Sequence, residues 1–365
     1  PNLLNLNNGG VSPQPQVVQD AVNRYYSLSN EAPSYYMWRV LDKDRSAVKR
    51  KLAGLAGVSA DTIAINRNTT EALDTVIFGL DLKAGDEVVL SNFDYPNMMN
   101  AWKQRELRDG IKLKWVKLNL PYEDENQLVN AYLDKLTPKT KVLHLTHLIN
   151  WTGQEVPVEK LCQIAAERGI FSIVDGAHSF AHLNFTVDSL GCDCFGTSLH
   201  KWLCAPFGTG LLHLKREHIG NIWPLFPADE PQSTNIAKFE NLGTRSLGPE
   251  MAIAHAIDFH LMIGAERKMK RLMFLKDYWC ERVQTHPKIR LNTPVNHLYG
   301  AIANFSIEGM AGEEISRKLH QEYRIHVVPI NWHHIDGVRV TPHVYTSTKE
   351  LDYLVDSVIT IANQA

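Results

Sequence analysis

Short apolar runs alternate with amphipathic stretches over the first two thirds of the chain. A short, almost wholly apolar run predicts a strand that is buried on both faces of its sheet. Between several of these runs lie segments with apolar residues at helical spacing, such as residues 158–168. Alternation of this kind is typical of an α/β fold in which helices cover both faces of a mainly parallel sheet. The seven strands predicted for this sheet are residues 62–66, 87–91, 112–116, 141–146, 171–175, 194–198 and 210–214.

The pattern differs on either side of this alternating region. Two stretches with helical spacing lie at or before its start, and a long helical pattern begins after Gly248. Shorter strand-like and helical segments follow, which favours a smaller α+β domain joined by the N-terminal arm. We therefore predict a large domain at residues 30–248 and a small domain formed by residues 1–29 and 249–365. The other expected elements are helices at 15–27, 43–56, 249–283, 312–322 and from Thr348 onward, and strands at 298–307, 325–330 and 338–341.

Composition narrows the classes of function. The chain has 365 residues, of which 44% are hydrophobic, and this is enough for a large core divided between two domains. A net charge of −2 gives no electrostatic basis for binding nucleic acid or an anionic membrane surface. No apolar stretch approaches the roughly 20 residues that a membrane span needs. An odd number of cysteines, five, favours free thiols over a disulfide framework. We expect a cytoplasmic protein, with a removed N-terminal export signal as the alternative.

Several histidines between residues 144 and 200 suggest a metal site at first sight. Most of them belong to separate predicted strands. His144 and His147 are three residues apart on an extended segment, so their side chains point to opposite faces. We therefore expect no metal site.

The most informative chemistry lies between residues 171 and 210. An apolar strand ends in Asp175, His178 follows three residues later, and Lys201 follows the next strand. In an open α/β sheet, ligands bind at the edge formed by the carboxyl ends of the strands. A lysine at that edge can bond covalently to a carbonyl cofactor, while an acid pairs with the cofactor's ring nitrogen. The alternative is a strand-end acid and an unrelated surface lysine.

These motifs resemble those of the class V aminotransferase family. Residues 175–178 read Asp-Gly-Ala-His, which matches that family's Asp-Gly-Ala-(Gln/His) stretch, and residues 198–201 match its Ser-x-His-Lys stretch. The resemblance covers nearly the whole chain and implies the fold of pyridoxal-phosphate-dependent transferases, of the aspartate aminotransferase type. It also implies a pyridoxal 5'-phosphate cofactor, with Lys201 forming the Schiff base and Asp175 keeping the pyridine nitrogen protonated. Within the family, the motifs are most similar to those of isopenicillin N epimerase-like proteins, and cysteine desulfurases are further relatives.

Hydroxyl side chains follow the predicted strand 62–66. Thr69 and Thr70 open a helix there, and the free N–H groups and positive dipole end of a helix N-terminus suit a phosphate dianion. The resemblance places the phosphate-binding threonine at Thr70, with Thr69 where alanine is usual, and adds Ser198 and His200 as phosphate contacts. A simple threonine cap on the helix is the alternative.

The resemblance also implies contacts with the cofactor ring. Tyr95 stands where the family has a histidine that stacks on the pyridine ring, and a tyrosine face can stack as well. Asn150 corresponds to the asparagine that binds the ring hydroxyl. His178 replaces the commoner glutamine near the same oxygen. A loop tyrosine packed on its own helix and a turn-forming asparagine are the alternatives.

Two further positions concern the partner and the substrate. Thr244, in Glu-Asn-Leu-Gly-Thr, resembles a residue that reaches across a dimer to the neighbour's phosphate. It implies a homodimer with a shared active site. Arg339 lies on a predicted strand where relatives bind the substrate carboxylate by a bidentate fork, which implies a small-molecule amino-acid substrate. An arginine paired with a surface glutamate is the alternative for Arg339.

The resemblance identifies the cofactor better than the reaction, because one fold supports transamination, racemisation, β-elimination and desulfuration. Desulfurases that pass sulfur through a persulfide carry a cysteine on a loop before the substrate arginine. Here residues 331–336 read Asn-Trp-His-His-Ile-Asp, and no cysteine follows Cys280. We therefore predict an isopenicillin N epimerase-like epimerase or racemase that acts at Cα, with Lys201 moving the proton. The alternatives are a class V aminotransferase and a β-lyase or desulfurase-like enzyme without a persulfide cysteine.

Two competing classes differ more widely. A non-catalytic binding relative would have no need of the reactive amine of Lys201 beside Asp175. A nicotinamide-dependent dehydrogenase would carry G-x-G-x-x-G after its first strand, and this chain has no such motif there.

Overall fold

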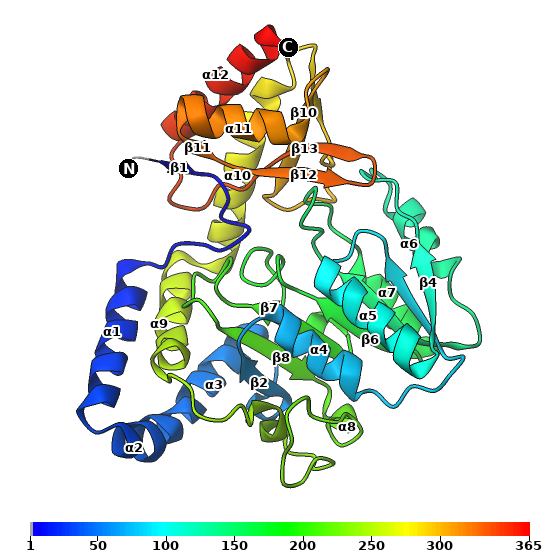
Figure 1. Ribbon diagram of the computed structural model, residues 1–365, viewed down its shortest axis with the longest axis vertical. Helices are drawn as coiled ribbons and strands as arrows, with labels where there is room; N and C mark the ends of the chain where they lie inside the picture. The colour runs from blue at the N-terminus through cyan, green and yellow to red at the C-terminus, as the bar shows by residue number, and fades with distance from the viewer. Residues whose placement is uncertain (1–2) are drawn as a thin grey trace.

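The centre of the molecule is a seven-stranded sheet (Figure 1). This computed structural model describes residues 3–365. The strand order is β2-β8-β7-β6-β5-β3-β4; β8 runs antiparallel to β2 and β7, and the other adjacent pairs are parallel. The predicted mainly parallel sheet is confirmed, with strand bounds within one residue of those expected. The strands are β2 Ile63–Asn66, β3 Glu87–Ser91, β4 Lys112–Val116, β5 Thr140–Thr146, β6 Phe171–Asp175, β7 Cys194–Ser198 and β8 Gly210–Leu214.

Both faces of this sheet are buried, which explains why its strands are nearly continuous apolar runs. Successive residues of β2 face opposite sides, so that Ile63 and Ile65 belong to one hydrophobic core and Ala64 belongs to another. Residues of α1 Gln16–Glu31, α3 Asp42–Ala56, α6 Glu125–Leu133, α7 Val158–Glu167 and α9 Gly248–Ile263 complete the first core, and residues of α4 Thr69–Gly79 and α5 Pro96–Asp109 complete the second.

A second sheet, of four antiparallel strands in the order β12-β13-β10-β9, lies in the upper part of Figure 1. Side chains such as Trp279 and Phe305 form a separate core between this sheet and its helices. The N-terminal arm reaches this region, because β1 pairs in parallel with β11. The elements are β1 Leu4–Asn5, β9 Ile289–Leu291, β10 Ala303–Ile307, β11 Ile325–His326, β12 Val328–Trp332, β13 Ile335–Val340, α10 Ala265–Val283, α11 Gly312–Tyr323 and α12 Thr348–Gln364.

The assignment of residues 1–29 and 249–365 to a small domain, and of residues 30–248 to a large one, stays a prediction. Helix α1 packs against α9, and Val18 of α1 belongs to the core of the large sheet, whereas β1 joins the second region. The arm therefore contacts both regions.

Several predicted elements differ from those observed; strand β13, expected at 338–341, begins at Ile335. The long helical pattern at 249–283 forms two helices, α9 and α10, because Gly264 between them has φ +88°, a conformation that favours glycine. The expected strand at 298–307 begins only at Ala303, and the short strand β9 was not predicted. The expected strand at 325–330 divides into β11 and β12, which pair with different partners.

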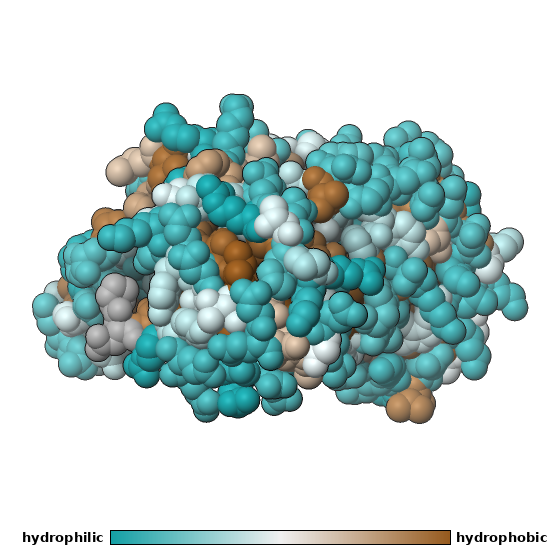
Figure 2. Space-filling view, turned by 90° about the horizontal axis from the view of Figure 1, so that it is seen from above, coloured by the Kyte–Doolittle hydropathy of each residue, from teal (hydrophilic) through white to brown (hydrophobic). Residues whose placement is uncertain are grey.

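Among residues 3–365, no helix combines the length and the apolar content that a membrane-spanning helix needs. The surface seen from above the second sheet is largely hydrophilic, with hydrophobic atoms gathered in a hollow near its middle (Figure 2). The short elements are α2 Pro33–Tyr35, a π-helical turn at Tyr36–Leu41, α8 Arg216–Ile219 and 3-10 turns at Ala60–Thr62, Asp188–Leu190 and Ile236–Glu240.

Candidate active site

One pocket of about 400 Å³ gathers all but one of the predicted site residues. It opens where the carboxyl ends of β5, β6 and β7 meet, and Gly9 and Gly10 of the N-terminal arm line it from the other side. Thr244 is exposed and lies outside this pocket. The predicted residues that line it are Thr69, Thr70, Tyr95, Asn150, Asp175, His178, Ser198, His200, Lys201 and Arg339.

Asp175 is the last residue of β6 and is only 3% exposed. Its Oδ1 atom accepts a hydrogen bond of 2.9 Å from the backbone N–H of Ala177, which holds the carboxyl at the edge of the sheet. Burial raises the pKa of Asp175, while that hydrogen bond and the charge of Lys201 act in the opposite direction. The negative charge of the Asp175 carboxylate is therefore only partly compensated within the protein, and a cationic group bound in the pocket would stabilise it.

Lys201 follows β7 after a short turn, and its Nζ atom lies 3.0 Å from Nε2 of His178. Burial lowers the pKa of Lys201 to about 8, against the raising effect of Asp175. A larger fraction of the amine is therefore neutral at physiological pH than in an exposed lysine, and the neutral form is a nucleophile and a base.

A residue that the sequence analysis did not identify determines the tautomer of His178. The indole Nε1–H of Trp202, which can only donate, points to Nδ1 of His178 at 3.4 Å. Burial holds the pKa of His178 well below its usual value, so the ring is neutral and carries its proton on Nε2. Nε2–H then donates to Lys201, and this requires the lone pair of a neutral amine. No sequence signal other than its place beside Lys201 indicates this role for Trp202.

The phosphate end of the pocket lies at the start of α4. Asn68 caps this helix by accepting from the N–H of Glu71 at 2.9 Å. The N–H of Thr69 donates to Oγ of Ser198 at 3.0 Å, and the two side-chain hydroxyls are 2.8 Å apart. Thr70, the next residue, also lines the pocket. The structure thus places hydroxyl donors at a helix N-terminus, an arrangement suited to phosphate.

His200 belongs to the same end of the pocket. Its Nδ1 atom lies 3.2 Å from the carbonyl oxygen of Thr209, and burial lowers the pKa of His200 to about 4. The ring is therefore neutral at pH 7, and Nδ1 carries the proton because a carbonyl oxygen only accepts.

The sequence analysis also missed a buried acid beneath the pocket. Asp94 is 1% exposed and accepts hydrogen bonds of 2.7 Å from Oγ1 of Thr146 and from the N–H of Ser91. Burial raises the pKa of Asp94 to about 7. Thr146 lines the pocket at the end of β5, and Asp94 orients it. Tyr95 follows Asp94, is 41% exposed, and lines the pocket at the start of α5.

Arg339 on β13 connects the second sheet to the pocket. The residue is 7% exposed, and its guanidinium donates to the carbonyl oxygen of Asn150 at 3.1 Å and to Oδ1 of Asn7 at 3.0 Å. Its Nε atom has no hydrogen-bond partner among residues 3–365, and no carboxylate in that range forms an ion pair with it. The alternative of a surface ion pair is therefore not observed. A buried guanidinium without a counter-ion suits an anionic ligand.

The aminotransferase class-V family model matches residues 4–353. The chain belongs to the aminotransferase class-V family. An isopenicillin N epimerase of Streptomyces clavuligerus is 27% identical to it over 375 residues, 98% of this chain and 94% of that protein. One from Amycolatopsis lactamdurans is 28% identical, with the same coverage. A probable cysteine desulfurase of Synechocystis sp. is 27% identical over 341 residues, 88% of this chain and 80% of that protein.

Two solved structures have the same fold as this chain. The apo structure of a cysteine desulfurase from Thermococcus onnurineus NA1 has a TM-score of 0.88 at 22% identity and covers 100% of this chain and 95% of that one. A mutant of C-DES with glycine covalently linked to its PLP cofactor has a TM-score of 0.87 at 22% identity and covers 98% and 96%. The predicted fold is confirmed.

Class-V membership also confirms the predicted cofactor, pyridoxal 5'-phosphate, and that the chain is an enzyme. The pocket fits this group, because a buried acid, a buried amine and a helix N-terminus with hydroxyl donors converge on it. The unpaired Nε of Arg339 leaves a donor for a further anion. The role of each individual residue stays a prediction.

Proposed function

We propose that the protein is an epimerase or racemase that acts at the Cα atom of an amino-acid-like substrate. When bound, pyridoxal 5'-phosphate withdraws electrons from that carbon and stabilises negative charge on it. The contact between Lys201 and His178 carries the proposal, since it favours the neutral form of an amine that shares the pocket with the unpaired donor of Arg339.

The residues at the start of α4 are the ones that would hold the phosphate. Thr69, Thr70 and Ser198 offer hydroxyls and backbone N–H groups, and neutral His200 lies beside them. Helix α4 directs its positive end to the same place. Together these groups would anchor the phosphate of the cofactor.

Four side chains would hold the ring. Asp175 would keep the proton on the pyridine nitrogen, and Tyr95 would stack on the ring face. Asn150 would bond the ring oxygen, and Nε2–H of His178 would donate to the same oxygen once the amine of Lys201 is attached to the cofactor. Each of these residues lines the pocket, and three of them are buried, which limits their freedom to move before the cofactor binds.

Lys201 has two tasks in this proposal. Its amine would attach the cofactor covalently, and once released it would take the proton from Cα as a general base. Inversion is completed when a donor that exchanges with solvent returns a proton to the opposite face of Cα. In the structure His178 donates Nε2–H to that amine, and the amine would give up this contact when its lone pair is needed for either task. Arg339 would hold the substrate carboxylate, and a fixed carboxylate sets the orientation of the Cα–H bond.

The choice of epimerisation rests on two observations. First, two isopenicillin N epimerases align with 98% of the length of this chain, at 27% and 28% identity. Second, among residues 3–365, no cysteine lines the pocket, all five are buried, and residues 331–336 lie at the β12–β13 hairpin without a thiol. A second candidate, a β-lyase without a persulfide cysteine, is favoured by the 27% identity to a probable cysteine desulfurase.

We further propose a cytoplasmic homodimer with a shared site. Thr244 is exposed outside the pocket of its own chain, as a residue that serves a neighbouring subunit would be. Free buried cysteines suit a reducing compartment.

Analysis of product stereochemistry tests the proposed reaction. The holoenzyme is incubated with a panel of single-enantiomer amino acids and peptides with a free α-amino acid end, and the products are separated by chiral chromatography. Epimerisation predicts the opposite configuration at Cα with no keto acid, ammonia or sulfide. Formation of a keto acid with an added acceptor would identify an aminotransferase, and ammonia or sulfide would identify a lyase.

A further inference from the structure

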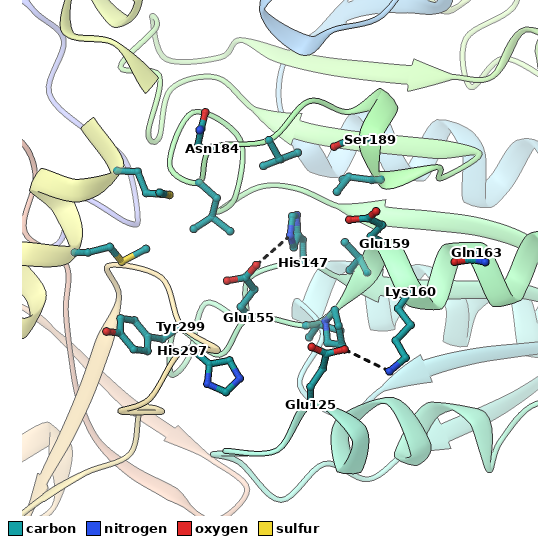
Figure 3. Close-up of a pocket in the computed structure, with 18 residues that line it drawn as sticks. Glu125, His147, Glu155, Glu159, Lys160, Gln163, Asn184, Ser189, His297 and Tyr299 are labelled. Carbon is teal, nitrogen blue, oxygen red and sulfur yellow. Dashed lines mark hydrogen bonds and ion pairs between the residues drawn. The ribbon is translucent and has the colours of Figure 1, made fainter. Parts of the chain in front are cut away.

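A second, larger cavity lies outside the candidate active site (Figure 3). It has a volume of about 630 Å³ and is named here the α7 pocket, because Val158, Glu159, Lys160 and Gln163 of α7 form one wall. Met269 and Met273 of α10 and the segment 297–299 form the opposite wall. It shares no lining residue with the candidate active site.

Glu155 places an uncompensated carboxyl in the α7 pocket. Its side chain is 33% exposed, and its one ion-pair contact among residues 3–365 is His147, whose Nε2 lies 3.9 Å from Oε1. Burial and the charge of Glu125 raise the pKa of Glu155 to about 7. The nearby Lys160 is engaged elsewhere, with Oε1 of Glu125 at 3.4 Å and Oδ1 of Asn126 at 3.1 Å. Within residues 3–365, no lysine or arginine neutralises Glu155.

His147 is a second polar group in this pocket, and its hydrogen-bonding capacity is not fully used within residues 3–365. This residue is 4% exposed, and its Nδ1 atom has no hydrogen bond within the described chain. The separation of 3.9 Å from Glu155 is too long for a hydrogen bond. Burial lowers the pKa of His147 to about 3, so the neutral ring does not compensate the carboxylate. Figure 3 shows the ring and the carboxyl group directed toward each other. Buried polar groups normally have partners, and here a ligand can supply them.

The rest of the lining is apolar or adaptable. Phe185 packs its edge on His147, with ring centroids 4.9 Å apart. Leu183 and Leu190 lie nearby, and Met269 and Met273 face them from α10. Methionine side chains adjust to ligands of different shape. No group of three or more potential metal ligands occurs in residues 3–365, so the charge of Glu155 points to an organic cation.

We propose that the α7 pocket binds a small organic amine. Its ammonium group pairs with Glu155 and donates to a neutral ring nitrogen of His147, and its carbon chain lies against Phe185 and the two methionines. An ammonium is matched to this pair because it carries positive charge and several N–H donors.

The α7 pocket lies beside the segments that build the active site. The backbone N–H of His147 donates to the carbonyl oxygen of Asp175 at 3.0 Å, and Thr146, its neighbour in sequence, lines the active site. Leu183 and Phe185 follow His178 on the same segment. The proposal concerns a binding site and does not depend on the proposed reaction.

Calorimetry on the holoenzyme tests this proposal with three probes of similar shape. The amine is 2-phenylethylamine, a primary amine that is protonated at neutral pH and then has three N–H donors. The holoenzyme is first reduced with borohydride, so that this probe cannot condense with the cofactor. The matched probes are neutral 2-phenylethanol and anionic 3-phenylpropanoate. The expected result is saturable binding of the amine, with the alcohol and the anion weaker by about tenfold or more. Equal binding of the alcohol, or no saturable binding of the amine, would overturn the proposal.

Two charge-removing variants locate the bound amine. Glu155→Gln should weaken its binding by about tenfold, because the variant loses a charge-assisted contact. Glu322→Gln removes an exposed charge on α11 and should leave binding unchanged. Unchanged affinity in folded Glu155→Gln, or a loss caused by Arg339→Lys instead, would place the probe elsewhere and contradict the proposal. If Glu155→Gln does not fold, the comparison of the three probes on the wild-type protein decides.

Discussion

The Nζ atom of Lys201 lies 3.0 Å from Nε2 of His178, and the proton in this contact belongs to the imidazole. The direction follows from Trp202, whose indole N–H occupies Nδ1 of the same ring. His178 can then only donate to Lys201, so the pair stabilises the neutral amine. Desolvation acts in the same sense, because burial lowers the pKa of Lys201 to about 8.

The pH dependence of cofactor uptake should follow from this contact. An amine attacks a carbonyl only as the free base, so the rate at which the apoprotein captures pyridoxal 5'-phosphate through Lys201 should rise with pH and level off above about 8. In Trp202→Phe, Nδ1 of His178 is released and the ring can accept from a protonated Lys201. The midpoint should therefore move upward by about half a pH unit to one unit.

Stopped-flow absorbance of the apoprotein mixed with cofactor measures this midpoint. Trp223→Phe, which changes an exposed indole outside the pocket, is the control and should keep the wild-type midpoint. A purely structural loss in Trp202→Phe would lower the amplitude without moving the midpoint, and that result would refute the assigned tautomer.

Asp175→Asn tests the electrostatic partner of the ring nitrogen. The amide keeps the shape of the side chain but loses the negative charge, so turnover should fall by about 10²- to 10³-fold or more while the fold is retained. Steady-state kinetics and circular dichroism measure the two effects. Asp229→Asn, an exposed substitution, should be silent. Near-normal turnover in Asp175→Asn would show that Asp175 has only a structural role at the end of its strand.

Arg339→Lys tests recognition of the substrate carboxylate. A lysine keeps the charge but loses the planar fork, so KM for amino-acid substrates should rise by about tenfold or more. The absorption spectrum of the bound cofactor should stay as in the wild type. The same change at Arg290, an exposed strand residue of the second sheet, should leave KM unaltered. If KM is unchanged in Arg339→Lys, the carboxylate is bound elsewhere.

The shared site is tested by mixing two inactive chains. Lys201→Ala removes the amine, and Thr244→Glu adds a negative charge where the neighbour's phosphate is expected. In a hybrid dimer, one of the two sites combines an intact Lys201 with an intact Thr244. An equimolar mixture refolded together should therefore regain about a quarter of wild-type activity. Ser246→Glu, an exposed neighbour, should be active alone. No recovery from dimers that have exchanged subunits would exclude a shared site.

The sequence predicts the strands of the large sheet well because each is buried on both faces, and burial on both faces produces a short, continuous apolar run. It also predicts the meeting of Asp175 and Lys201, since strands β6 and β7 are parallel neighbours whose carboxyl ends share one edge. The position of β8, antiparallel between β2 and β7, depends on pairing between distant segments and is not visible in local periodicity.

The site residues that the sequence did not reveal contact residues that are far from them in the sequence. Trp202 acts through a hydrogen bond to a residue 24 positions away, and Asp94 acts through Thr146, 52 positions away. Neither contact has a local spacing that could indicate it. The break at Gly264 was also missed, because a helical pattern continues on both of its sides and only the backbone conformation of the glycine divides it.

Hydrogen exchange with solvent tests most directly whether Lys201 moves a proton at the substrate Cα, on which the proposed function depends. The holoenzyme is incubated in deuterated water with an amino acid that it epimerises, and the recovered substrate and product are analysed by mass spectrometry and proton NMR. We expect one deuterium at Cα of the product, and no exchange above background in Lys201→Ala. Turnover without deuterium at Cα, or a persulfide formed on one of the five cysteines at the rate of turnover, would contradict this role of Lys201.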